Sequence, residues 1–339
     1  MPTPFPNYMK DNKLIVIDYM RFVAILSIVA WHCCICPYLC WNLVDIETLP
    51  INYPFRVVAM VFFPDATMPL FTFISGYLFS YLLGQGKYKE FRPFVINKLH
   101  RLIIPFLVIG TLVNLTSYDR FMEDIPWGEG SHLWYCCMLF WCFIITWTVV
   151  KYAQRYGLYL MFAVSLLLEV YVRNHFDMGF KLPLGIHQSI YYIGYFICGY
   201  LLFQNQEYLG LLNRHKYALL ISYILACIIA LMNVPLVSKV FVIVHNYIYS
   251  ILLLVILGKF KLKKPVFSSI VARVCKYSFG IYVFHEWISW NFCNHPPVTL
   301  VLREHYVLFP LFNTVIIFIL SYCLTGISLR TKVGRYLLL

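Results

Sequence analysis

The chain has 339 residues, of which 61% are hydrophobic and 12% are charged, and its mean hydropathy is +0.73. Soluble domains carry about 25% charged residues, so the composition excludes a soluble globular protein and indicates an integral membrane protein. The net charge of +12 does not indicate a nucleic-acid partner, because the basic residues follow the expected membrane topology. We therefore predict an all-α fold, a polytopic bundle of about ten transmembrane helices.

Runs of apolar residues set the predicted spans. They lie at 14–35, 56–83, 102–117, 132–150, 157–172, 188–204, 217–232, 240–257, 277–293 and 306–329. Ten spans place both termini on one side. Twenty of the 27 Lys and Arg residues then fall on that side, at 10–13, 87–101, 151–155, 214–216, 259–276 and 330–335. Positive residues favour the cytoplasm, so we predict cytoplasmic termini and a single transmembrane domain over 1–339, with no fused soluble domain, in a bacterial inner membrane.

The first span carries three ionisable residues, Asp18, Arg21 and His32. Each costs roughly 3 kcal/mol or more at the bilayer centre, so their presence indicates a function. Arg21 and His32 are 11 residues apart, which places them about 16 Å apart along nearly one face of a helix. With the predicted topology, Arg21 lies toward the cytoplasm and His32 toward the outside. Asp18 is explained equally well by catalysis and by a structural ion pair with Arg21.

The second span contains Pro69 and the pair Ser75-Gly76. Pro69 is expected to kink the helix, because proline lacks a backbone N–H. Ser75-Gly76 permits either close backbone approach or local unwinding, and broken backbone at membrane depth is tolerated only against protein or a polar cavity. The alternative is that these small residues only pack helices. Asp65 precedes them and is either a partner for His32 or an interfacial acid.

The third and fourth spans begin with candidate ligand-binding residues. Lys98 and Arg101 stand at the predicted inner end of the third span and are suited to phosphate, although basic side chains also reach to lipid headgroups. The fourth span starts with His132-Leu-Trp134-Tyr135. Trp134 is either a substrate contact or a member of the interfacial aromatic belt.

The ninth span brings several polar residues to one helical face. Ser278, Tyr282 and His285 follow helical steps, and Glu286 comes directly after them. An intramembrane His-Glu pair is not expected to face lipid. We predict that Tyr282, His285 and Glu286, with Ser75, Gly76 and Trp134, bind substrate.

Other intramembrane polar residues have simpler interpretations. Glu169 and Arg173 are four residues apart and are expected to pair with each other. His245 has only Asn246 as a polar neighbour on its helix and is expected to be a packing residue. Most of the twelve cysteines lie in apolar runs and are interpreted as small buried hydrophobes. Cys36 and Cys40 leave a disulfide open as an alternative, and no metal is predicted.

Together these motifs resemble the membrane-bound acyltransferase-3 family, whose ten-span enzymes acylate cell-surface glycans and related acceptors. The matching blocks are Asp18-x-x-Arg21 followed by His32, Met68-Pro-Leu-Phe with Phe73-Ile-Ser-Gly-Tyr77, the basic patch with Arg101 and Pro105, and Tyr277 to His285. His132-Leu-Trp134-Tyr135 is a weaker fifth block. The arginine and histidine of the first span are the most specific part.

The resemblance implies transfer of an acyl group, most often acetyl, from cytoplasmic acyl-CoA to a hydroxyl of a surface polysaccharide or lipid-linked sugar. It matches His32 to the family's essential histidine, expected to act as general base or acyl carrier, and Arg21 to the family's arginine, a candidate to position the acyl-CoA. Asp18 completes the predicted catalytic set. Lys98 and Arg101 would hold the acyl-CoA phosphates. Asp65 and Glu286 both remain candidates to orient His32. Besides the donor and the glycan, membrane lipids are the expected partners, and the alternative function is export of a polysaccharide or lipid-linked sugar.

Overall fold

The computed structural model describes residues 7–45, 67–114, 123–129, 131–175, 181–231, 235–258, 265–306 and 308–338. Every regular element in these ranges is a helix, which confirms the predicted all-α class. The helices are α1 (Asn7–Cys34), α2 (Cys36–Leu39), α4 (Thr67–Gly84), α5 (Phe91–Lys98), η2 (Leu99–Ile103), α6 (Ile104–Asn114), η3 (Ile125–Trp127), η4 (Ser131–Leu133), α8 (Trp134–Tyr152), α9 (Gln154–His175), η5 (Pro183–Gly185), α10 (Ile186–Gln204), α11 (Gln206–Arg214), α12 (Lys216–Leu231), α13 (Pro235–Leu257), α14 (Pro265–Cys293), α15 (Pro296–Glu304), α16 (Phe309–Ser328) and α17 (Lys332–Leu338).

Seven stretches within the described residues are long and apolar enough to cross a membrane. They are Ile15–Tyr38, Thr67–Gly84, Phe91–Leu112, Ile125–Tyr152, Gln154–Arg173, Lys239–Leu257 and Phe309–Ser328. Lys216–Ile229 is a shorter apolar helix, and α10 and α14 coincide with two more predicted runs. Each of the ten predicted runs thus overlaps a helix. The protein is an integral membrane protein, while the count of ten spans and the side of the termini stay predictions.

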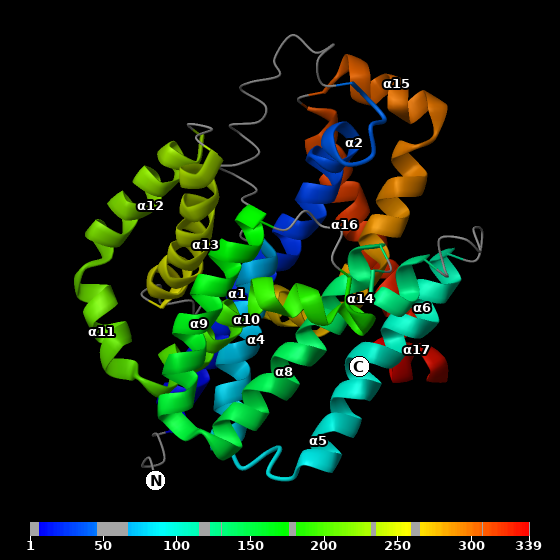
Figure 1. Cartoon of the computed structure of the whole chain (residues 1–339). Coiled ribbons are helices and arrows are strands. Elements are labelled where there is room, and N and C mark those ends of the chain that lie inside the picture. Colours follow the sequence, from blue (N-terminus) through cyan, green and yellow to red (C-terminus); the bar gives the residue numbers. More distant parts are fainter. Residues whose placement is uncertain are drawn as a thin grey trace.

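Helix α1 lies inside the bundle, where it packs against α4, α13, α14 and α16. Helix α10 packs in turn against α4, α8 and α9, so two central helices connect the rest (Figure 1). Large side chains such as Ile25, Phe79, Phe106 and Phe196 are fully buried between these helices. The first span therefore presents His32 to neighbouring helices and not to lipid.

The outward faces of the peripheral helices are apolar. Leu160 and Leu167 on α9 and Phe312 on α16 are each about two-thirds exposed or more, at 68%, 72% and 66%. In water such a surface would drive association, because apolar area exposed in continuous patches is unfavourable. Lipid tails cover it without that cost. Contact of these faces with membrane lipids stays a prediction.

The structure corrects the prediction of a broken second span. Helix α4 continues without interruption from Thr67 to Gly84. Pro69 lies in its first turn, where the backbone N–H groups have no helical partner, so proline causes no break there. Ser75-Gly76 is not unwound. A Cβ atom added to Gly76 would lie 1.8 Å from the carbonyl oxygen of Phe196 on α10, so the close-approach and helix-packing alternatives are confirmed.

Gly76→Ala is expected to destabilise the protein by about 1–3 kcal/mol or more, because the methyl group cannot fit unless α4 and α10 separate. A lower melting temperature in detergent and less folded protein in the membrane would show this. Gly84→Ala is the matched control on the same helix, since nothing lies within 4 Å of the added Cβ. Equal melting temperatures for the two variants would contradict the assignment.

The third predicted span begins earlier than expected, at Phe91 and not at 102. Its helix includes a π-helical turn, η2. Pro105 follows this turn and has no N–H to donate to the carbonyl of Arg101, four residues earlier. A π-turn passes such a position without ending the helix. The π-turn contains Arg101 of the predicted basic patch.

The structure also tests the expectations for Glu169, for His245 and for the cysteines. Glu169 and Arg173 form the predicted ion pair at 3.1 Å. His245 is buried, contacts Asn246 at 3.2 Å and stacks on Tyr223, which confirms its packing role. All twelve cysteines are free thiols, and most are buried, so the Cys36–Cys40 disulfide does not form.

Candidate active site

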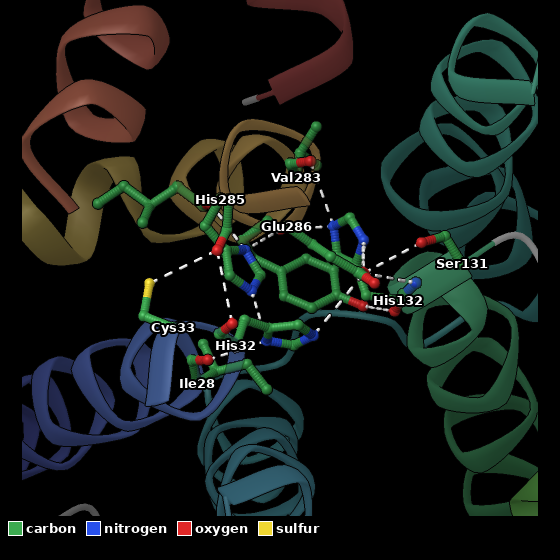
Figure 2. Close-up of polar contacts among 11 residues, drawn as sticks. Ile28, His32, Cys33, Ser131, His132, Val283, His285 and Glu286 are labelled. Atoms are coloured by element: carbon green, nitrogen blue, oxygen red, sulfur yellow. Dashed lines mark hydrogen bonds and ion pairs between the residues drawn. The ribbon is translucent and has the colours of Figure 1, made fainter. Parts of the chain in front are cut away.

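Three segments distant in sequence bring their polar side chains together (Figure 2). Helix α1 contributes His32, α14 contributes His285 and Glu286, and the short turn before α8 contributes Ser131 and His132. The three imidazoles are buried, with exposed fractions of 8% or less. The ring centroids of His32 and His285 are 4.6 Å apart, and those of His132 and His285 are 5.1 Å apart. These five residues are referred to below as the histidine cluster.

Hydrogen bonds assign the protons of His285 and His32. Nδ1 of His285 lies 2.7 Å from the carbonyl oxygen of Tyr282, so it must donate, and Nε2 of the neutral ring then accepts. This Nε2 lies 3.1 Å from Nδ1 of His32, which also lies 2.9 Å from the carbonyl oxygen of Ile28. Nδ1 of His32 therefore carries the proton. Its Nε2 is left with a free lone pair, which is the condition for a general base.

Glu286 stands opposite that free nitrogen. Its Oε2 lies 3.7 Å from Nε2 of His32. The same oxygen accepts hydrogen bonds from the Ser131 hydroxyl and from the backbone N–H of His132, both at 3.0 Å. Donors of this kind favour the ionised form of a carboxylate. Glu286 is thus held as an anion in front of the nitrogen that would become positively charged.

His132 supplies the third contact to Glu286. Its Nε2 lies 2.8 Å from the carbonyl oxygen of Tyr282, and its Nδ1 forms an ion pair with Oε2 of Glu286. Both ring nitrogens therefore face oxygen atoms of α14. The Tyr282 hydroxyl donates in return to the carbonyl oxygen of His132. The turn before α8 is thereby fixed on α14.

Sequence reasoning placed His285, Glu286 and Tyr282 at the site but did not include Ser131 or His132. His132 begins the weak fifth motif of the fourth span, and that motif was the available signal. It could not be interpreted because only the tertiary structure aligns the turn before α8 with the middle of α14. Between the two carboxylates left open, the structure brings Glu286 to His32. Asp65 lies outside the described residues.

Arg21 and Asp18 lie elsewhere on α1. They form an ion pair at 3.6 Å, with both side chains partly exposed. The Cys275 thiol of α14 donates to the backbone oxygen of Asp18 at 3.0 Å. The structural ion pair considered for Asp18 is therefore present. Arg21 is about 16 Å along the helix from His32, so it does not belong to the histidine cluster.

The two residues predicted to hold phosphate differ in their surroundings. Lys98 is 7% exposed, and its ammonium lies 3.5 Å from the ring centre of Phe143 and 4.9 Å from that of Tyr88. These aromatic faces stabilise the cation. Arg101 is exposed on the π-turn. Of the two, Arg101 is the accessible cation.

A basic cavity lies between α14, α16 and α17. It has a volume of about 590 Å³ and is lined by Lys276, Arg330 and Arg335 together with the rings of Tyr277 and Tyr322. Helix α17 also contacts the π-turn, where the Tyr336 hydroxyl lies 2.7 Å from Nδ1 of His100. The two basic segments at 259–276 and 330–335 were assigned to the same side of the membrane. The cavity brings parts of both together.

Trp134 lies at the start of α8, next to the histidine cluster. Its ring centre is 5.4 Å from that of Tyr192, and it lines a cavity together with Ser131. Within the described part of the chain, no group of three or more His, Cys, Asp or Glu side chains has the arrangement of a metal site. The histidine cluster is held by hydrogen bonds and ion pairs.

A family model described as an acyltransferase domain, acyltransferase-3, matches residues 14–330 of the chain. The match covers both α1 and α14 and therefore the whole histidine cluster. No curated protein and no solved structure matches the chain significantly.

Proposed function

Because this chain belongs to the membrane acyltransferase-3 family and is therefore an acyltransferase, we propose that it moves an acetyl group from cytoplasmic acetyl-CoA to a glycan hydroxyl. The acceptor is a surface polysaccharide or a lipid-linked sugar, and the site of action is the bacterial inner membrane. Family membership favours this enzyme over the sugar exporter that was the alternative. We propose the identity of the acyl donor, the class of the acceptor and the residues that carry out the transfer.

The observation that carries the proposal is the free Nε2 of His32 facing the carboxylate of Glu286 at 3.7 Å. A hydroxyl is a weak nucleophile unless a base takes its proton. His32 takes that proton on Nε2 as the oxygen attacks the thioester carbonyl. The imidazolium that results faces the Glu286 anion, so the charge that develops is stabilised where it appears.

The second half of the reaction returns the proton. The tetrahedral intermediate collapses, the bond between carbon and sulfur breaks, and the proton on His32 passes to the departing sulfur. The products are the O-acyl sugar and free CoA thiol, and His32 is again neutral. A transient acyl-histidine on Nε2 is the other route considered, and it uses the same nitrogen as nucleophile.

The basic cavity between α14, α16 and α17 is the best candidate for the phosphates of the donor. Three cations line it, and the two tyrosine rings offer a surface for the adenine base. Lys276 and His285 are nine residues apart on α14, which corresponds to about 14 Å along the helix. The extended pantetheine arm would have to cover that distance. Arg101 adds a further exposed cation near α17.

The proposal is tested with isolated membranes and radiolabelled acetyl-CoA. Membranes that contain the protein are expected to move label into the glycan fraction, and membranes from a strain with the gene deleted are expected not to. Base treatment should release the label as acetate, since an ester is formed. Equal labelling of glycan by the two membrane preparations would overturn the proposed donor and acceptor.

A further inference from the structure

A second cavity of about 720 Å³ lies beside the histidine cluster, in the size range of small-molecule sites. Its walls come from the turn before α8, the end of α9 and the start of α10. Glu129 and Ser131 line it from the chain before α8, and Arg173, Lys181 and His187 line it from the chain between the end of α9 and the start of α10. The predicted topology assigns both regions to the outer side. Aromatic rings dominate its lining, namely those of Trp134, Tyr171, Tyr191 and Tyr192. We refer to it as the aromatic pocket.

The cations of the aromatic pocket are already paired. Lys181 lies 2.5 Å from Glu129, which raises the pKa of the lysine through their hydrogen bond. Arg173 pairs with Glu169, and that carboxylate also accepts from the Tyr195 hydroxyl at 2.9 Å. The pocket therefore presents polar groups without an unbalanced charge. Such a lining does not select for an anionic ligand.

One polar atom in this lining lacks a partner. The side-chain oxygen of Gln188 is buried and accepts no hydrogen bond from any described residue. A buried acceptor without a donor costs about 1–3 kcal/mol. A turn of the Gln188 amide toward the pocket would let a ligand hydroxyl supply the missing donor. His187 beside it accepts the backbone N–H of Leu182 on Nδ1, at 3.1 Å, which leaves the proton on Nε2, 3.4 Å from Glu129.

The pocket is joined directly to the histidine cluster through Ser131. This serine lines the pocket, and its hydroxyl donates to Glu286 at 3.0 Å. A molecule in the pocket therefore lies one side chain away from the carboxylate that faces His32. The combination of aromatic rings, a buried acceptor and balanced charge suits a pyranose ring, which has an apolar C–H face and several hydroxyl groups.

We propose that the aromatic pocket binds a neutral sugar unit of the acyl acceptor, with one face of the ring against Trp134 and Tyr192 and a hydroxyl donating to Gln188. The inference rests on the proposed function and adds to it the place where a sugar unit of the acceptor binds. A lipid tail is the other occupant that the aromatic lining could hold, and the experiment distinguishes it.

The test measures steady-state transfer by the full-length protein in membranes. The probes are radiolabelled acetyl-CoA and envelope glycan prepared from the gene-deleted source strain. Gln188→Leu and Trp134→Leu are each expected to raise the KM for glycan about tenfold, the order of one lost hydrogen bond or ring contact. The KM for acetyl-CoA should not change. The double variant Arg330→Gln/Arg335→Gln should raise the KM for acetyl-CoA and leave the KM for glycan unchanged.

The matched control is Tyr156→Leu, an aromatic side chain on α9 that is 88% exposed and lies outside the pocket. A glycan KM equal to the control in both pocket variants would overturn the inference while the proposed function stood. Loss of a co-purifying lipid from these variants, measured by mass spectrometry, would also overturn the inference and leave the proposed function standing. Absence of label transfer by the unmodified protein would overturn the proposed function and the inference with it. If Trp134→Leu fails to accumulate, Gln188→Leu decides.

Discussion

His32→Ala is expected to lower the rate of acyl transfer by about 10²–10⁴-fold, the usual contribution of a general base. The variant loses the nitrogen that faces Glu286 and keeps the other imidazoles of the histidine cluster. The measurement is the initial rate of label transfer from acetyl-CoA to glycan, normalised to the amount of protein in the membrane. His32→Gln, which retains a polar side chain, should show a similar loss.

His215→Ala is the control for this experiment, because His215 is an exposed histidine at the end of α11. It should transfer acyl groups at the rate of the unmodified protein. Transfer by His32→Ala within a factor of two of the His215 control would remove His32 from the reaction. Equal melting temperatures for the unmodified protein and His32→Gln would separate loss of chemistry from loss of folding.

Glu286→Gln is expected to reduce kcat by about 10²–10³-fold, the magnitude observed when one preorganised electrostatic contact is removed from an active site. The amide has nearly the same size as the carboxylate but carries no charge. It therefore cannot stabilise an imidazolium at His32, and it also changes the contact of Glu286 with His132. The KM for acetyl-CoA should stay within about twofold, because the basic cavity is untouched.

Glu304→Gln on α15 provides the matched control, since Glu304 is an exposed carboxylate near the end of that helix. Glu286→Asp is informative as well, because it retains the charge and withdraws it by one methylene. Partial activity in Glu286→Asp with almost none in Glu286→Gln would identify charge as the requirement. A kcat for Glu286→Gln equal to that of the Glu304 control would rule out the electrostatic role.

Helical periodicity and the cost of charge in a membrane together identified three of the five residues of the histidine cluster. Steps of four and three residues from Ser278 through Tyr282 to His285 placed these on one face of α14, and the cost of charge in a membrane marked His32 and Glu286. Local rules could not supply the contact of Glu286 with His132, because the two lie 154 residues apart. Such a contact depends on how helices pack, and no single span carries that information.

The prediction of a kink at Pro69 was wrong because the position of a residue within its helix decides its effect. Pro69 was expected to kink a helix, yet in a first turn it costs nothing. Phosphate binding by Lys98 stays a prediction, and the rings around its ammonium come from α5, from α8 and from the segment between α4 and α5. The sequence shows that Lys98 is a basic residue at the start of the third predicted span. The surrounding aromatic side chains were not foreseeable from the local sequence.

The hydrogen bonds of His32 and His285 leave Nε2 of His32 as the nitrogen that takes the proton in the general-base route. In this route the nitrogen receives the proton of the attacking hydroxyl and gives a proton to the departing sulfur within one turnover. No proton is then taken from or given to either aqueous compartment at this step. Acyl transfer by this route moves no net charge across the bilayer, so the membrane voltage neither drives nor opposes it.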